Sequence, residues 1–127
     1  MATLTKELFS EIAAISGRRF VVSSVTASAA DVFHVVPSDS TYKDECWVYA
    51  HNFGSTDVDV TFLWALTSMP TLSTGDVQEC VDVTIPFKSG RALIFDGALL
   101  LHSLSAAVYA SSTNAISIDG FVNRIDS

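Results

Sequence analysis

The chain has 127 residues, the length of one ordinary domain, and its 14 acidic residues against seven Lys and Arg give a formal net charge of −7. This balance argues against binding to nucleic acid or to an anionic membrane surface, since no cluster of Lys and Arg is present. Hydrophobic residues make up 49% of the chain and charged residues only 17%, against roughly 25% charged in average proteins. A surface so poor in charge exposes apolar or neutral groups, and large apolar patches mark interfaces. The composition therefore favours assembly with other copies or partners.

Residues 1–17 are predicted to form a helix or an arm in front of the main domain. Apolar side chains recur there at helical spacing: Leu4, Leu8, Phe9, Ile12 and Ile15. Gly17 suits the end of a helix, so a helix is expected over residues 4–15, with an arm docked on a neighbour as the alternative. No cleavable signal core is evident, and no apolar stretch reaches the ~20 residues of a membrane helix, so we expect a soluble protein.

From residue 18 to residue 127 the chain changes to β-branched, aromatic and small residues, interrupted by turn residues. Strands are predicted over residues 20–26, 32–36, 46–53, 58–64, 77–85, 91–95, 99–101, 104–110 and 115–125. About eight short strands separated by turns are the pattern of an all-β antiparallel sandwich or jelly roll. No linker or internal repeat divides residues 18–127, which are expected to form one β-sandwich domain.

Two β-hairpins are expected within this domain. Residues 46–53 and 58–64 alternate with period two around a short turn, which predicts a hairpin with one buried face. The Asp96-Gly97 pair is a strong turn signal, so residues 93–95 and 99–101 are expected to form the second hairpin.

No catalytic constellation can be assembled from the sequence. The histidines His34, His51 and His102 show no metal-ligand spacing, and each is interpreted as a surface or interface residue. Ser103 follows His102, but adjacent strand residues point to opposite faces, and no G-x-S-x-G motif or Gly-rich phosphate loop is present. We therefore expect a protein that is not an enzyme and that has no cofactor and no metal.

Two further pairs of residues are candidates for a metal site or a disulfide. Asp57 and Asp59 face the same way on a strand, which favours a solvated strand face or a charged edge, with a calcium site as the alternative. Cys46 and Cys80 lie far apart in the sequence and are interpreted as reduced, half-buried cysteines, with a disulfide between two strands as the alternative.

The aromatic residues and the few cations suggest where an interface lies. Trp64 alternates in phase with the apolar residues Val58, Val60 and Phe62 and is predicted to be core. Trp47, Tyr49 and Phe53 share a face that is either core or an exposed aromatic interface. Exposed aromatics also allow a carbohydrate-binding module as an alternative. The arginines are expected to pair either with acids of a neighbouring subunit or with local acids. The candidate interface comprises Leu4, Leu8, Phe9, Arg18, Arg19, Trp47, Tyr49 and Arg124.

Two segments carry a family resemblance. Residues 17–36 read GRRFVVSSVTASAADVFHVV, a Gly-Arg-Arg entry into a first strand, and residues 84–125 read TIPFKSGRALIFDGALLLHSLSAAVYASSTNAISIDGFVNRI. In the second segment, an Ile-Pro strand end, a D-G step and a small-residue strand lead to the closing GFVNRI of residues 120–125. In these segments, about half of its length, the chain resembles the small β-sandwich virion proteins of tailed bacteriophages.

The resemblance implies a structural role in the virion, with no catalytic residues to carry over. It implies a capsid decoration (cement) protein that stabilises the head, or alternatively an adaptor of the neck, tail or fibre. The partners would be the major capsid protein or neck and tail proteins, and the chain would form a homo-oligomer, for example a closed trimer. The place of action would be the phage particle, assembled in the host cytoplasm.

Overall fold

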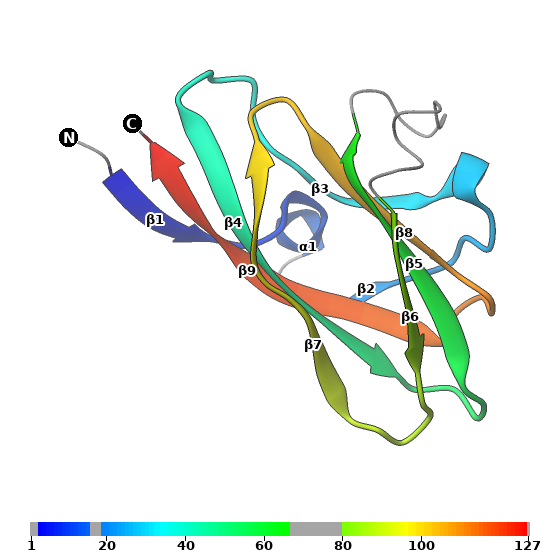
Figure 1. The fold of residues 1–127 in the computed structure, drawn as a ribbon. Helices are drawn as coiled ribbons and strands as arrows, with labels where there is room; N and C mark the ends of the chain where they lie inside the picture. Colours follow the sequence, from blue (N-terminus) through cyan, green and yellow to red (C-terminus); the bar gives the residue numbers. More distant parts are fainter. Residues whose placement is uncertain (1–2, 16–18, 67–79, 127) are drawn as a thin grey trace.

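Two antiparallel β-sheets packed face to face make up the structure, a computed structural model that describes residues 3–15, 19–66 and 80–126 (Figure 1). The five-stranded sheet, called sheet A here, contains β1 (Thr3–Glu7), β9 (Ile116–Asp126), β4 (Tyr42–Asn52) and β7 (Arg91–Leu101) in this order, and β2 (Phe20–Val21) also pairs with β9. Sheet B contains β3 (Asp31–Val35), β8 (Ser105–Ala110), β5 (Val58–Leu66) and β6 (Cys80–Ile85). A short helix, α1 (Ser10–Ala14), and a 3-10 turn, η1 (Ala27–Ala29), complete the described elements. The prediction of an all-β sandwich is confirmed.

The core lies between the two sheets and is built from the inward residues of each strand. On β4, Cys46, Val48 and Ala50 are fully buried, while Trp47 and Tyr49 alternate with them on the other side. This is the division of faces that the period-2 pattern predicts. Aromatic rings make edge-to-face contacts in the core: the ring centroids of Phe9 and Phe33 are 5.2 Å apart, and those of Phe62 on sheet B and Phe95 on sheet A are 5.4 Å apart. Trp64 packs 4.6 Å from Phe95 in the core, as predicted.

The hairpin predicted for residues 46–64 is wrong, because β4 and β5 belong to different sheets. Both strands bury one face, and this alternation is the same whether they pair in one sheet or face each other across the core. The buried side-chain amide of Asn52 holds the connection in which the chain passes from β4 in sheet A to β5 in sheet B. Its Nδ2 donates to the carbonyl oxygens of Thr56 and Ile85, at 2.8 and 2.9 Å, and its Oδ1 accepts from the Gly54 N–H.

The hairpin predicted at Asp96-Gly97 is also wrong, because β7 runs through these residues as one strand. β4 is long enough to pair with both halves of β7, and the register shifts between Cys46, opposite Ala98, and Trp47, opposite Asp96. Gly97 is the extra residue of this β-bulge and has a φ of +103°. The same conformational freedom of glycine that a hairpin turn needs is used here to bend an edge strand.

The predicted helix over residues 4–15 is correct only in its second half, since residues 3–7 form β1. They pair with residues 122–126 of β9, so tertiary hydrogen bonding wins over a helical pattern that is too short to be stable alone. Only Ser10–Ala14 are helical, and Ile12, like the preceding Phe9, is buried in the core. The N-terminal segment is therefore part of the sandwich, with one strand in sheet A.

Two smaller predictions concern the first strand and the cysteines. The strand expected over residues 20–26 is limited to β2, after which the chain crosses toward sheet B, where the Ala110 N–H donates to the carbonyl of Ser24.

Cys46 is a free and buried thiol, and its burial raises the pKa of the thiol. The side chain of Cys80 and the 77–79 part of the predicted strand lie outside the described residues.

Candidate functional site

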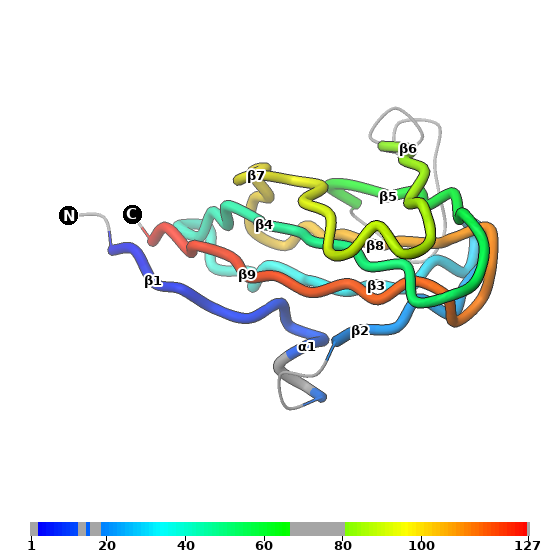
Figure 2. The backbone as a smooth tube through the Cα atoms, turned by 90° about the horizontal axis from the view of Figure 1, so that it is seen from below, coloured from blue at the N-terminus to red at the C-terminus, as the bar shows by residue number. Residues whose placement is uncertain are grey.

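The outer face of sheet A is the broad sheet surface that points away from the core. Opposite residues of an antiparallel pair point to the same side, so the partners of Trp47 and Tyr49 on the neighbouring strands lie on this face with them. Its members include Leu4 and Lys6 of β1, Asp119, Phe121, Asn123 and Ile125 of β9, Lys43, Glu45, Trp47, Tyr49 and His51 of β4, and Arg91, Leu93, Asp96, Leu99 and Leu101 of β7. Figure 2 shows the four contributing strands side by side in the order β7, β4, β9 and β1.

Large apolar side chains are exposed on both flanks of this face. Leu93, Leu99 and Leu101 on β7 are 49%, 51% and 43% exposed, and Leu4 on β1 is 66% exposed. Single exposed leucines are ordinary, but Leu99 and Leu101 are neighbours on this face and form a small apolar patch, which Asp96, opposite Trp47, separates from Leu93. The sequence prediction missed the β7 leucines, because a hairpin at Asp96-Gly97 would have separated them.

Aromatic rings occupy the centre of the face. The rings of Trp47 and Phe121 stack with an interplanar angle of 9° and a centroid distance of 6.1 Å. The Nζ of Lys6 lies 4.2 Å from the centroid of the Phe121 ring, a cation–π contact. The bulge glycine, Gly97, lies beside the indole of Trp47, and a Cβ at this position would make an ordinary van der Waals contact with the ring at 3.6 Å. The centre is therefore a packed surface with fixed side chains.

The rest of the aromatic surface is covered by an arginine. The guanidinium of Arg91 lies 3.5 Å from the centroid of the Tyr49 ring, and its Nε donates to both carboxylate oxygens of Asp119 at 3.1 and 3.0 Å. Arg19 approaches the same carboxylate at 3.8 Å. Because Arg91 covers one side of Tyr49, this ring does not offer that side to a sugar, whereas Phe53 is exposed just beyond the end of β4.

A buried polar network lies on the inner side of the same sheet. Asp44 has no exposed surface and accepts two hydrogen bonds from Arg124, from Nε to Oδ1 and from Nη2 to Oδ2, both at 2.9 Å. Its Oδ2 also lies 2.7 Å from the Nε2 of His34, which is buried. The prediction of a surface or interface role for His34 is therefore wrong. Of the two alternatives for the arginines, Arg124 follows the second, because it pairs with an acid of its own chain, Asp44.

The network anchors α1 to the sandwich. The backbone N–H of Ser10 donates to the Nδ1 of His34 at 3.0 Å, so the proton of the imidazole sits on Nε2 and points to Asp44. The Ser10 hydroxyl accepts from the N–H of Val35 at 3.0 Å and does not reach the imidazole. Ser10, His34 and Asp44 thus contain the residue types of a hydrolytic triad without its geometry, and they act as a structural tie.

The network makes stability depend on acidic pH. Burial raises the pKa of Asp44, but the hydrogen bonds from Arg124 and His34 together outweigh it and hold the pKa below its ordinary value. The stabilisation is therefore complete above the ordinary aspartate pKa of about 3.9 and is lost as the pH falls below it. We expect the free energy of unfolding to fall more steeply below about pH 5 in the natural chain than in Asp44→Asn, in urea titrations at several pH values. Equal slopes would contradict this role of Asp44.

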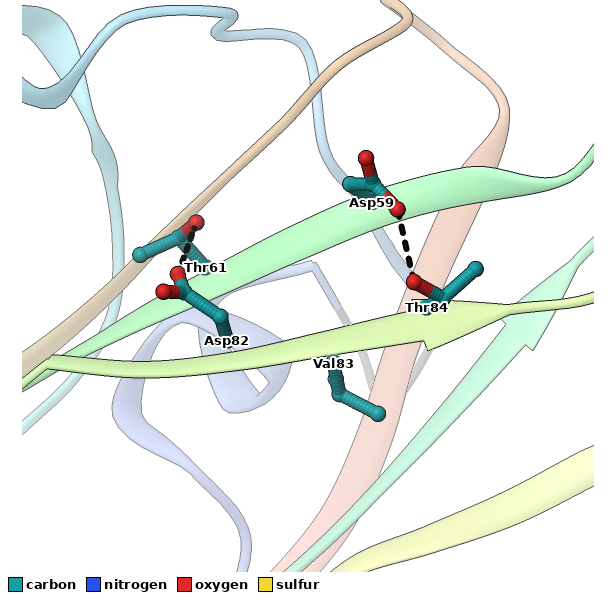
Figure 3. A pocket seen from close by; sticks show the side chains of 5 residues that line it. All are labelled: Asp59, Thr61, Asp82, Val83 and Thr84. Carbon is teal, nitrogen blue, oxygen red and sulfur yellow. Dashed lines mark hydrogen bonds between the residues drawn. The ribbon is translucent and has the colours of Figure 1, made fainter.

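A shallow hollow of about 460 Å³ lies on the outer side of β5 and β6 and is lined by Asp59, Thr61, Asp82, Val83 and Thr84. Figure 3 shows a hydroxyl from one strand pointing to a carboxylate on the other: Thr61 donates to Asp82 and Thr84 to Asp59, each at 2.7 Å. These bonds are a cross-strand ladder, and Asp82 places a charge on the edge strand of sheet B. Asp57, weighed with Asp59 as a calcium ligand, instead accepts from the N–H of Phe87 at 3.2 Å.

The predicted interface residues are distributed over several places. Leu4, Trp47 and Tyr49 share the outer face of sheet A, where Arg19 also reaches Asp119, and Leu8 is exposed just after β1. Phe9 has no exposed surface, so its assignment to an interface is wrong; the helical spacing that selected it also marks core residues. Arg124 lies on the inner side with Asp44, and Arg18 lies outside the described residues.

Among the residues that the structure describes, no group of three His, Cys, Asp or Glu side chains is placed to hold a metal ion, and no helix is long and apolar enough to cross a membrane. Comparison with known protein families, with curated proteins and with solved structures finds no match to this chain.

Proposed function

We propose that this chain is a non-catalytic structural protein of a tailed-bacteriophage virion, and that it acts as a capsid decoration (cement) protein that stabilises the head. The observation that carries the proposal is the outer face of sheet A, where the exposed leucines of β7 flank an aromatic centre of packed side chains. The likeness of residues 17–36 and 84–125 to phage virion proteins supplies the virion context.

The face suits repeated assembly for a physical reason. Each square ångström of apolar surface removed from water contributes about 25 cal/mol before the entropic cost of association. Side chains that are already held in place lose little further freedom when a partner covers them. Trp47 is stacked on Phe121, and Arg91 is bound to Asp119 and Tyr49, so the centre of the face is ordered before binding. A small gain per copy becomes large over the many copies of a capsid lattice.

An adaptor in the neck, tail or fibre would use the same face in far fewer copies, and a carbohydrate-binding module would use exposed aromatic rings. Copy number separates the two virion roles. Decoration requires on the order of hundreds of copies in a symmetric shell, whereas an adaptor at one vertex or along a short tail requires a few to a few tens.

The proposal is tested by quantitative mass spectrometry of purified particles, together with thermal stability of particles that lack the protein. We expect the chain in high copy number on heads, and we expect heads without it to assemble but to open at a lower temperature. Recovery of the chain with tails and its absence from tailless heads would instead indicate an adaptor. Absence from every particle fraction would contradict a virion role.

A further inference from the structure

We infer that β1 is an exchangeable arm, and that copies of this protein associate by placing the β1 of one copy on the β9 of a second copy. The structure itself defines this partner, since the slot that receives the arm is the edge of β9 that β1 occupies within its own chain. The inference goes beyond the proposed virion role and does not depend on it.

The first support is that β1 is held to the sandwich mainly through its backbone. All five of its side chains are exposed, and Leu4 has 66% of its surface exposed. Its contacts are the ladder with residues 122–126 of β9 and the ammonium of Lys6, which lies 4.2 Å from the centroid of the Phe121 ring. Figures 1 and 2 show this strand at the edge of sheet A, beside the end of β9. A strand that buries no side chain can leave the sheet without opening the core.

The segment that follows β1 is held much more firmly. Phe9 and Ile12 are buried in the core, and the backbone N–H of Ser10 donates to the Nδ1 of the buried His34 at 3.0 Å. Leu8, which is exposed, is the one residue between the end of β1 and this anchor. The N-terminal segment therefore consists of a loosely held arm and a fixed base, with a pivot at Leu8.

Exchange between copies preserves the contacts of the arm. The five residue pairs of the β1–β9 ladder and the contact of Lys6 with Phe121 are the same whether the arm lies on its own chain or on a second copy. The remaining cost is confined to the pivot and to the freedom that two copies lose when they associate. Where copies are already held close together, most of that freedom is lost beforehand, so proximity favours exchange.

The length of the arm limits where the second copy lies. Five residues of extended chain reach about 17 Å from Leu8, so the β9 of the second copy must come within that distance of the pivot. The copies therefore meet at the β1 edge of sheet A. Reciprocal exchange joins two copies about a twofold axis, and exchange in one direction closes a ring.

The test is a disulfide that can form only between two chains. Leu4 lies opposite Ile125 in the β1–β9 register, so Leu4→Cys in one chain and Ile125→Cys in another are joined when the arm of the first lies on β9 of the second. After the two variants are mixed at high concentration and oxidised, we expect at least about tenfold more 4–125 disulfide by peptide mass spectrometry than in a control mixture. The control is Val25→Cys with Ile125→Cys, because Val25 is also exposed but lies in the loop after β2.

A locked arm supplies the second measurement. In a single chain that carries both Leu4→Cys and Ile125→Cys, oxidation in dilute solution should form the bond within the chain and hold β1 in place. The natural chain is expected to associate with rising concentration in sedimentation velocity, and the locked chain is expected to stay monomeric. Circular dichroism and thermal unfolding under reducing conditions establish that each variant is folded.

Three results would overturn the inference: a mixed disulfide no more abundant than in the control mixture, a natural chain that is monomeric at every concentration, or a locked chain that associates as strongly as the natural one. Each of these results leaves the virion role standing, because that role is measured on particles. Conversely, exchange in solution by a chain that is absent from every particle would overturn the virion role alone.

Discussion

Replacing Gly120 by alanine is expected to lower the free energy of unfolding by at least about 3 kcal/mol. Gly120 lies in β9 opposite Val48, with a φ of +141°, a conformation that alanine rarely adopts. A Cβ at this position would overlap the carbonyl oxygen of Trp47 and lie 3.0 Å from Cε2 of the buried Phe9. Because the first obstacle is backbone, relief requires β9 and β4 to separate at the centre of sheet A. Urea-induced unfolding of the two proteins measures the difference.

Gly90→Ala separates steric overlap from conformational strain. Gly90 also has a positive φ, of +79°, but a Cβ there meets nothing within 4 Å. This variant should lose only about 1 kcal/mol, the cost of a left-handed conformation for a residue with a Cβ. Equal losses at the two positions would show that the backbone contact with Trp47 is not the cause.

The period-2 alternation predicted much of the fold, because burial on one face is a local property of a strand. It assigned Trp64 to the core correctly, and it separated Cys46 and Val48 from Trp47 and Tyr49 while leaving open which of the two faces of this strand is buried. It could not decide which strands share a sheet, because β4 and β5 show the same alternation of buried and exposed residues although they lie on opposite sides of the core. Residues 3–7 became a strand through a partner more than a hundred residues away, β9, which no local pattern indicates.

Only part of the candidate interface could be predicted from the sequence, because the alternation describes one strand at a time and not which strands are neighbours. Trp47 and Tyr49 were found as one face of a single strand, whereas the leucines that flank them come from β7, whose continuity depends on pairing with β4. One local signal was available for the buried network. Extending the alternation of β4 backward by one step from Cys46 places Asp44 inside, and a buried carboxylate requires partners.

Replacing Asp44 by alanine is expected to lower the free energy of unfolding by about 3–5 kcal/mol, as for other broken buried ion pairs. Two groups lose their partner at once. Arg124 is 18% exposed and can turn partly toward water, but the imidazole of His34 has almost no exposed surface. Its Nε2–H is left without an acceptor in the core, and the cost of such a group cannot be recovered from solvent. Asp44→Asn should lose less, because the amide keeps the size of the carboxylate and one acceptor oxygen.

Asp59→Ala is the matched control for Asp44→Ala, since both are strand aspartates that accept hydrogen bonds from a neighbouring strand. Asp59 is exposed and accepts from the Thr84 hydroxyl, so its loss should change the free energy of unfolding by no more than about 0.5 kcal/mol. In Asp44→Ala the helix α1 should also lose its tie, because Ser10 is held by the same His34. Faster amide hydrogen exchange in residues 10–15 would report this loosening. Unchanged stability, or exchange that rises equally across the sheet, would show that Asp44 does not hold the N-terminal segment in place.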